Sequence, residues 1–202
     1  MEGRRIIKTH LSLGMLPNKV LSTEGVKLVY VCRNPRDVVV SYHNHEKLFK
    51  NYSGGFDNFF DAFLEGVAGF YSPFMEHVLE YWNASKSNEK SILFLKYEDM
   101  KRDLRKEVRK VGQFLNQDVS EEQVRMLCEH LDFKNMKENN AVNKRDVVEM
   151  KRKMNGAEPG SFMRKGETGD WKVNLSKDQV FRIEEWESKY LKNTDFRFSY
   201  EL

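Results

Sequence analysis

Polar and cationic side chains follow the first long apolar run of the chain, VKLVYVC over residues 26–32. A run of this kind is typical of a strand that is buried on both faces. After it, Asn34 is suited to cap a helix that begins at Pro35, although the same residues could form a type I turn between two strands. The residues beyond Pro35 lose the alternation of a strand, which favours the helix.

A strand that leads directly into a helix creates a site for an anion, because free N–H groups and the positive end of the helix dipole converge there. Arg33 follows the strand, where α/β sheets bind ligands, and its guanidinium can hold a phosphate through two hydrogen bonds. Ser41 lies roughly two turns into the helix and reaches the same ligand if that ligand lies along the helix. The other interpretation of these residues is a local ion pair between Arg33 and Asp37.

A second cationic segment, FMRKG over residues 162–166, precedes Trp171. The adjacent side chains of Arg164 and Lys165, together with the permissive backbone of Gly166, are suited to wrap an anion. The alternative is a surface loop in which both cations are solvated.

Lys8 and His10 form a third candidate site, beside a strand expected over residues 5–8. Alternation along a strand places both side chains on one face. A neighbouring lysine keeps an imidazole neutral, which suits a general base, although a lone histidine is more often structural. The other histidines show no spacing typical of metal ligands, so we expect no metal site.

The composition restricts the class of protein that carries these sites. The 202 residues have a net charge of +3, and 12% are aromatic, which indicates one folded domain rather than a disordered chain. No apolar run approaches the roughly 20 residues of a membrane-spanning helix, and no nucleic-acid-binding motif is present, so neither a membrane nor a nucleic acid is expected as a partner. Cys32 and Cys128 are expected to be free thiols in a reducing compartment, which favours a cytoplasmic location.

The elements that must position these residues follow from hydrophobic periodicity and helix caps. The run ILFLK over residues 92–96 predicts a second buried strand, and Ser176 with Gln179 predicts a capping box. Residues 139–160 are rich in charged and small side chains and are expected to form a long mobile loop with some helical tendency. Further helices are expected over residues 56–66, 72–85, 100–115, 120–131 and 176–190. Strands that alternate with helices predict an α/β domain with a parallel sheet and helices on both faces.

Four segments, KTHL, CRNPRDVVVSY, KYEDM and FMRKGETGDWK, resemble motifs of the cytosolic sulfotransferases in their order and spacing. The resemblance covers residues 7–175. It implies a parallel-sheet fold of the P-loop-kinase kind. It also implies transfer of a sulfuryl group from 3′-phosphoadenosine 5′-phosphosulfate (PAPS) to a small-molecule phenol, alcohol or amine, without a metal. The nucleotide product is 3′-phosphoadenosine 5′-phosphate (PAP).

The resemblance further implies a role for each candidate residue. His10 resembles the family's general base, and Lys8 resembles the neighbour that stabilises charge during transfer. The residues implied to hold the 3′-phosphate of the donor are Arg33, Ser41, Arg164, Lys165 and Gly166. The residues implied to lie beside the nucleotide are Tyr97, Phe133, Met136, Phe162 and Met163. The aromatic candidates for an acceptor pocket, most of which are expected in the core, are Phe49, Tyr52, Phe56, Phe59, Phe60 and Phe63.

The sequence departs from the family's pattern in several places. The signature TYPKSGTTW, which cradles the 5′-phosphosulfate ahead of KTHL, is absent. We therefore expect a single domain over residues 1–202 that lacks its first strand and phosphosulfate loop and is weakly active or inactive. Ser12, Leu131 and Asp132 stand where the family usually has proline, threonine and serine. The family's dimer motif matches poorly, so no oligomeric state is predicted.

Three alternatives to a sulfotransferase follow from the same residues. One is a relative that binds PAP without catalysis. The second is a remote relative of nucleotide kinases, which would need a phosphate-binding loop. The third is a basic interaction module built on residues 144–153.

Overall fold

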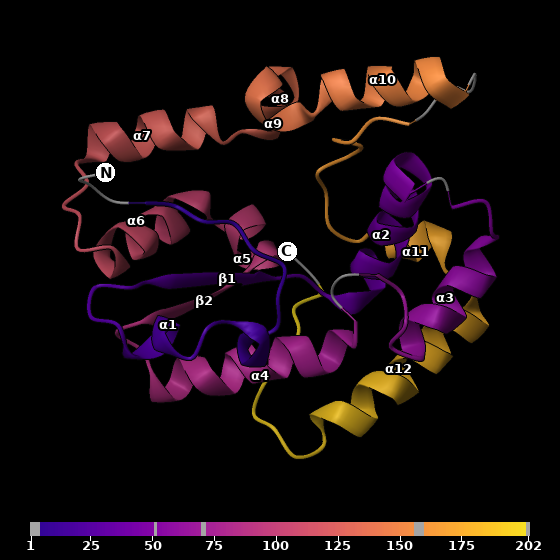
Figure 1. The fold of residues 1–202 in the computed structure, drawn as a ribbon, viewed down its shortest axis with the longest axis horizontal. Coiled ribbons are helices and arrows are strands. Elements are labelled where there is room, and N and C mark those ends of the chain that lie inside the picture. The colour runs from indigo at the N-terminus through magenta and orange to yellow at the C-terminus, as the bar shows by residue number, and fades with distance from the viewer. Residues whose placement is uncertain (1–4, 51, 70–71, 156–159, 201–202) are drawn as a thin grey trace.

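The computed structural model describes residues 5–50, 52–69, 72–155 and 160–200. Its centre is a pair of parallel strands, β1 (Leu28–Cys32) and β2 (Ile92–Lys96), in which Leu28 lies opposite Ile92 (Figure 1). Parallel strands need a long crossover connection. Three helices supply it, namely α2 (Pro35–Lys50), α3 (Phe56–Leu64) and α4 (Phe74–Ser87). The predicted α/β architecture is confirmed.

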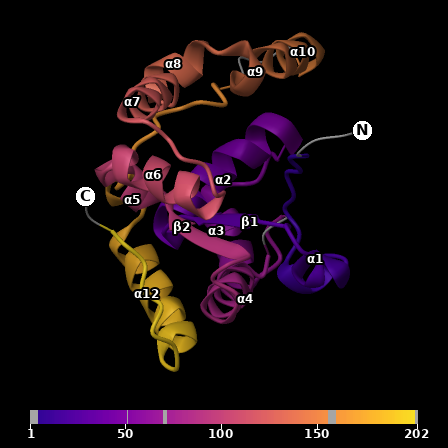
Figure 2. The same ribbon diagram turned by 90° about the vertical axis from the view of Figure 1, so that its left-hand side faces the viewer.

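Helices cover the strand pair from both sides (Figures 1 and 2). On one side, Tyr30 of β1 stacks on Tyr81 of α4 with the ring centroids 4.2 Å apart. On the other side lie α5 (Tyr97–Arg102) and α6 (Leu104–Phe114). Within the described ranges, no helix has the length and apolar character needed to cross a membrane.

The helix expected over residues 100–115 is divided at Asp103. The backbone of Asp103 leaves the helical region, with φ at −149° and ψ at 84°, and its side chain accepts a hydrogen bond from the N–H of Lys106 at 3.0 Å. Asp103 therefore caps a second helix, because the aspartate carboxylate accepts from one of the backbone N–H groups that the first turn of a helix leaves free.

Four helices form an arm along one side of the molecule (Figure 1). They are α7 (Glu121–His130), α8 (Phe133–Glu138), α9 (Asn140–Asn143) and α10 (Arg145–Asn155). The prediction of a loop over residues 139–160 is wrong for most of its length, because α9 and α10 occupy it, whereas the helical tendency is confirmed. Residues 156–159 lie outside the described residues. The charges that suggested a loop suit a helix, with Asp146 in the first turn and Lys153 in the last turn of α10.

The hydrophobic core lies where α2, α3 and α4 meet α12 (Lys177–Leu191). Phe60 and Phe63 of α3 are 0% and 1% exposed, and burial of each such side chain stabilises the fold by about 1.5–3 kcal/mol. The predicted capping box at the start of α12 is confirmed, since Ser176 Oγ accepts from the N–H of Gln179 at 3.2 Å. The remaining short elements are a 3₁₀ helix (Leu13–Met15), α1 (Lys19–Ser22) and α11 (Trp171–Asn174).

Two expectations about strands are wrong. Residues 5–8 pair with no strand in the described part of the chain, and Ile6 and Ile7 are 93% and 83% exposed. β1 is not buried on both faces, because Val29 and Val31 are 44% and 49% exposed. Their side chains alternate with Tyr30 and point away from α4. That face of β1 stays half exposed, because α5 and α6 on the same side pack against β2.

Candidate functional site

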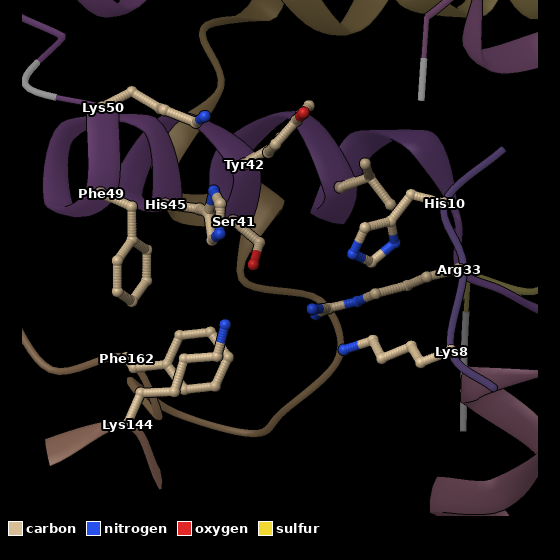
Figure 3. A pocket seen from close by; sticks show the side chains of 11 residues that line it. Lys8, His10, Arg33, Ser41, Tyr42, His45, Phe49, Lys50, Lys144 and Phe162 are labelled. Atoms are coloured by element: carbon tan, nitrogen blue, oxygen red, sulfur yellow. The ribbon is translucent and has the colours of Figure 1, made fainter. Parts of the chain in front are cut away.

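A cavity of about 490 Å³ opens where β1 ends and follows one face of α2 (Figure 3). Four of its lining residues are lysine or arginine and two are histidine, whereas none is acidic. Such a lining favours an anionic ligand. The lining residues are Lys8, His10, Arg33, Val38, Ser41, Tyr42, His45, Phe49, Lys50, Lys144 and Phe162.

The first turn of α2 is held by a buried polar network. Asn34 caps the helix, since its Oδ1 accepts from the N–H of Asp37 at 2.9 Å, which confirms the helix over the alternative turn. Its Nδ2 donates to Asp37 at 3.0 Å and to Glu98 at 2.8 Å. Asp37 and Glu98 are each 1% exposed, and every such buried polar group needs hydrogen-bond partners.

Asp37 also holds the second cationic segment against this helix. Its two carboxylate oxygens accept from the N–H of Gly169 at 2.8 Å and from that of Trp171 at 3.1 Å. The loop that follows residues 162–166 is therefore fixed to the start of α2, although more than a hundred residues separate them along the chain.

Arg33 joins the strand end to the same loop. Its guanidinium forms an ion pair with Asp37 at 3.3 Å, donates to the carbonyl of Glu167 at 2.5 Å, and lies 4.7 Å from the ring centroid of Tyr97. Burial raises the pKa of the Tyr97 hydroxyl, so this side chain stays neutral beside the arginine. The local ion pair and the cavity site are thus both present, because Arg33 contacts Asp37 and still lines the cavity.

Gly166 takes a backbone conformation that favours glycine, with φ at +67°, and packs directly on the ring of Phe133. Arg164 and Lys165 turn their side chains to Asp170, with which both form ion pairs. Burial opposes the charge of Asp170, but hydrogen bonds from Lys165 and Arg164 lower the pKa of its carboxyl. Neither cation is among the residues that line the cavity.

The segment that carries His10 is attached to α4 by four hydrogen bonds. His77 Nε2 donates to the carbonyl of His10 at 3.3 Å, and the Tyr81 hydroxyl donates to that of Leu11 at 3.0 Å. Glu80 accepts from the N–H groups of Leu13 and Gly14 at 3.0 and 2.6 Å. These three side chains lie on one face of a helix, at the spacing that brings i, i+3 and i+4 together.

The structure thus brings five of the predicted site residues to one cavity, namely Lys8, His10, Arg33, Ser41 and Phe162. Tyr97 lies beside Arg33, and Phe133 lies beside Gly166. Met136 and Met163 are half-buried outside the cavity lining. Of the aromatic candidates for an acceptor pocket, Phe49 lines the cavity, whereas Phe59, Phe60 and Phe63 are core residues.

Several lining residues had no place in the sequence-based prediction. Helical spacing offers a signal for Tyr42 and His45, because His45 lies three and four residues after Tyr42 and Ser41 and four residues before Phe49, which was already a candidate. Lys144 belongs to the charged stretch over residues 139–160, for which the sequence predicts a loop. In the described residues, no three His, Cys, Asp or Glu side chains are grouped as metal ligands.

Fold and site together define an α/β protein with a cavity, lined by cationic side chains, at the carboxyl end of its first strand. A family model of the sulfotransferase domain matches residues 1–195, and the chain belongs to the sulfotransferase family. The predicted family and fold are therefore confirmed.

Relatives of known function or structure share most of this chain. Luciferin sulfotransferase of Photinus pyralis is 38% identical over 199 residues, which are 97% of this chain and 53% of that protein. Sulfotransferase 1A1 of Rattus norvegicus is 36% identical over 98% of this chain and 66% of its own length. The chain therefore spans about half to two thirds of these relatives.

Two solved structures are similar in fold. Retinol dehydratase in complex with androsterone and the inactive cofactor PAP superposes with a TM-score of 0.83 and 36% identity, over 93% of this chain and 53% of that one. Mouse sulfotransferase SULT7A1 complexed with PAP gives a TM-score of 0.78 and 27% identity, over 96% of this chain and 68% of that one.

Proposed function

We propose that this chain binds PAPS and takes part in the transfer of its sulfuryl group to a hydroxyl of a small molecule. The observation that carries this proposal is the position of Arg33, which lines an acid-free cavity at the end of β1 and is held there by Asp37 and Tyr97. The related structures with PAP, and the luciferin sulfotransferase, support the same class of donor and acceptor.

The residues present fit the phosphate of a nucleotide. Arg33 Nε is buried and has no hydrogen-bond partner among the described residues, so it has a donor to offer. Ser41 lies farther along the same wall of the cavity (Figure 3). Gly166 brings its backbone close to this region, and the rings of Tyr97 and Phe133 flank it, as expected for a site that also holds a base. PAPS, when bound, supplies the sulfuryl group.

His10 is proposed as the general base and Lys8 as its cationic neighbour. Partial burial, then the charges of Lys8 and Lys144, lower the pKa of His10 below its ordinary value of 6.5. The imidazole is therefore neutral at physiological pH and would accept the proton of an acceptor hydroxyl. The ammonium of Lys8 would stabilise negative charge that spreads over the transferred group.

A cytoplasmic location is proposed from the cysteines. Cys32 and Cys128 are both free thiols in the structure, as suits a reducing compartment. Burial raises the pKa of the Cys32 thiol, which keeps it protonated and unreactive.

Replacement of Arg33 by alanine should weaken PAP binding by about ten- to a hundredfold, the value of a charge-assisted phosphate contact. Isothermal titration calorimetry measures the affinity, and circular dichroism confirms the fold of the variant. Arg125→Ala is the matched control, because Arg125 lies on α7 and pairs only with surface acids among the described residues. Absence of PAP binding by the unmutated chain, or equal affinities of Arg33→Ala and the unmutated chain, would contradict the proposed donor site.

Titration of His10 should give a midpoint below pH 6.5, since burial and two lysines oppose its protonation. Proton NMR follows the imidazole signal, which His10→Gln assigns by its loss. Sulfuryl transfer should fall as the pH drops through the same midpoint, because the protonated imidazole cannot accept a proton. A midpoint above 6.5 would contradict the lowered pKa, and transfer that His10→Gln leaves unchanged would exclude His10 as the base.

A relative that binds PAP without catalysis is the second candidate. It is favoured by residues 5–8, which include Lys8 and pair with no strand in the described part of the chain. No sheet therefore fixes the position of Lys8. This candidate predicts PAP binding that depends on Arg33 together with no transfer of radiolabelled sulfate to phenols or alcohols.

A further inference from the structure

Three rings gather at the end of the cavity opposite to Arg33 (Figure 3). The centroids of Phe49 and Phe162 lie 5.5 Å apart at an interplanar angle of 72°, and His45 lies 4.8 Å from Phe49. An edge-to-face pair of this kind is a favourable wall for a flat aromatic ligand. The cavity therefore has a cationic end at Arg33 and an aromatic end at Phe49.

Lys144 reaches into the aromatic end from the junction of α9 and α10 (Figure 3). Its ammonium lies 5.3 Å from the ring centroid of Phe49 and 5.1 Å from that of Phe162. Both distances are in the range of cation–π attraction. The charge of Lys144 is thus placed over the surface that an aromatic acceptor would use.

The backbone holds Lys144 in an unusual conformation. It is in the left-handed region, with φ at +52°, which residues other than glycine seldom adopt. Buried Asn143 fixes the turn, since its Nδ2 donates to the carbonyl of Lys137 and its Oδ1 accepts from the N–H of Arg145, both at 2.9 Å. Strain of this kind persists only where the surrounding structure fixes it, and residues held in this way are often found at ligand sites.

No carboxylate lines the cavity, and none pairs with Lys144 among the described residues. Its neighbour Arg145 pairs with Glu138 instead. A neutral acceptor entering between the rings would displace the ammonium without giving it a new partner. An acceptor with a negative group would supply a partner for the Lys144 ammonium, while the aromatic part of the acceptor covers the rings of Phe49 and Phe162.

We infer that the acceptor is an aromatic acid, a phenol with a carboxylate or a similar anionic group, and that Lys144 recognises the negative charge. This inference rests on the proposed sulfuryl transfer and specifies its acceptor. The hydroxyl of such a molecule points to His10, and the carboxylate points to the junction of α9 and α10.

Two phenols of nearly equal shape test the inference. p-Hydroxyphenylacetate carries the charge, and p-hydroxyphenylacetamide lacks it. Calorimetry or ligand-observed NMR on the PAP-loaded chain should give the acid about fivefold tighter binding than the amide, as one partly exposed ion pair allows. Added salt should reduce this difference.

Substitution at position 144 assigns the difference to one residue. Lys144→Met should remove the preference for the acid, Lys144→Arg should keep it, and both should bind PAP like the unmutated chain. Lys151→Met is the matched control, because Lys151 lies on α10 but does not line the cavity. It should bind both phenols unchanged.

The outcomes separate this inference from the proposed function. A chain that does not bind PAP contradicts the proposed function and, with it, the inference. A chain that binds PAP but binds acid and amide equally, or binds neither, overturns the inference alone. So does a Lys144→Met chain that keeps its preference for the acid, or one that loses PAP affinity as Arg33→Ala does.

Discussion

Replacement of Asp37 by alanine should lower the free energy of unfolding by about 3–5 kcal/mol, because three buried or half-buried donors besides Arg33 lose their acceptor. Its carboxylate, 1% exposed, is the point where Arg33, Gly169 and Trp171 meet the start of α2. Without it, two backbone N–H groups lose their acceptor, and the buried side chain of Asn34 loses one partner. Urea unfolding followed by circular dichroism measures the loss.

The same substitution should weaken PAP binding at least as much as Arg33→Ala does, about tenfold or more. Asp37 lies outside the cavity lining, so this effect would act through the position of Arg33 and of the loop. Asp37→Asn keeps the shape of the side chain and removes its charge, which offers a folded variant if alanine prevents folding.

A matched control exists in the first turn of α12. Asp178 is exposed there, and its replacement by alanine should cost less than about 1 kcal/mol, the value of one acid at a helix N-terminus. Equal losses of stability for Asp37→Ala and Asp178→Ala would refute the proposed network.

Local signals in the sequence predicted most of the elements that frame the site. The Asn34–Pro35 cap, the apolar runs of β1 and β2, and the capping box at Ser176 each depend on neighbouring residues only, and the structure has all of them. The loop expected over residues 139–160 failed because the charged faces of α9 and α10 were interpreted as solvated coil.

Contacts between distant parts of the chain could not be predicted from the sequence. The attachment of His10 to α4 depends on Glu80 and Tyr81, which have no unusual spacing by themselves. The turn of Arg164 and Lys165 toward Asp170 also depends on how the loop folds back. Arg33 could be predicted because strand, cap and cation are adjacent in the sequence, whereas Lys144 enters the cavity only through the packing of the arm.

Replacement of Gly166 by alanine adds only one methyl group, yet it should strongly disturb the candidate site. A Cβ at this position would lie 2.0 Å from the ring of Phe133, and the backbone φ of +67° adds strain. Left-handed backbone and overpacking together should lower the free energy of unfolding by about 2–4 kcal/mol. PAP binding should weaken with it, because the displaced ring and loop flank the proposed phosphate site.

Gly25→Ala separates the two causes. Gly25 has a φ of +80°, but nothing lies within 4 Å of its would-be Cβ, so only the backbone cost of about 1 kcal/mol should remain. The double variant Gly166→Ala with Phe133→Ala should be less destabilised than the sum of its single variants, since the clash is gone when the ring is removed. If Gly166→Ala costs no more than Gly25→Ala and leaves PAP affinity intact, Phe133 does not pack on this loop in solution. The aromatic side of the proposed nucleotide site would then have to lie elsewhere.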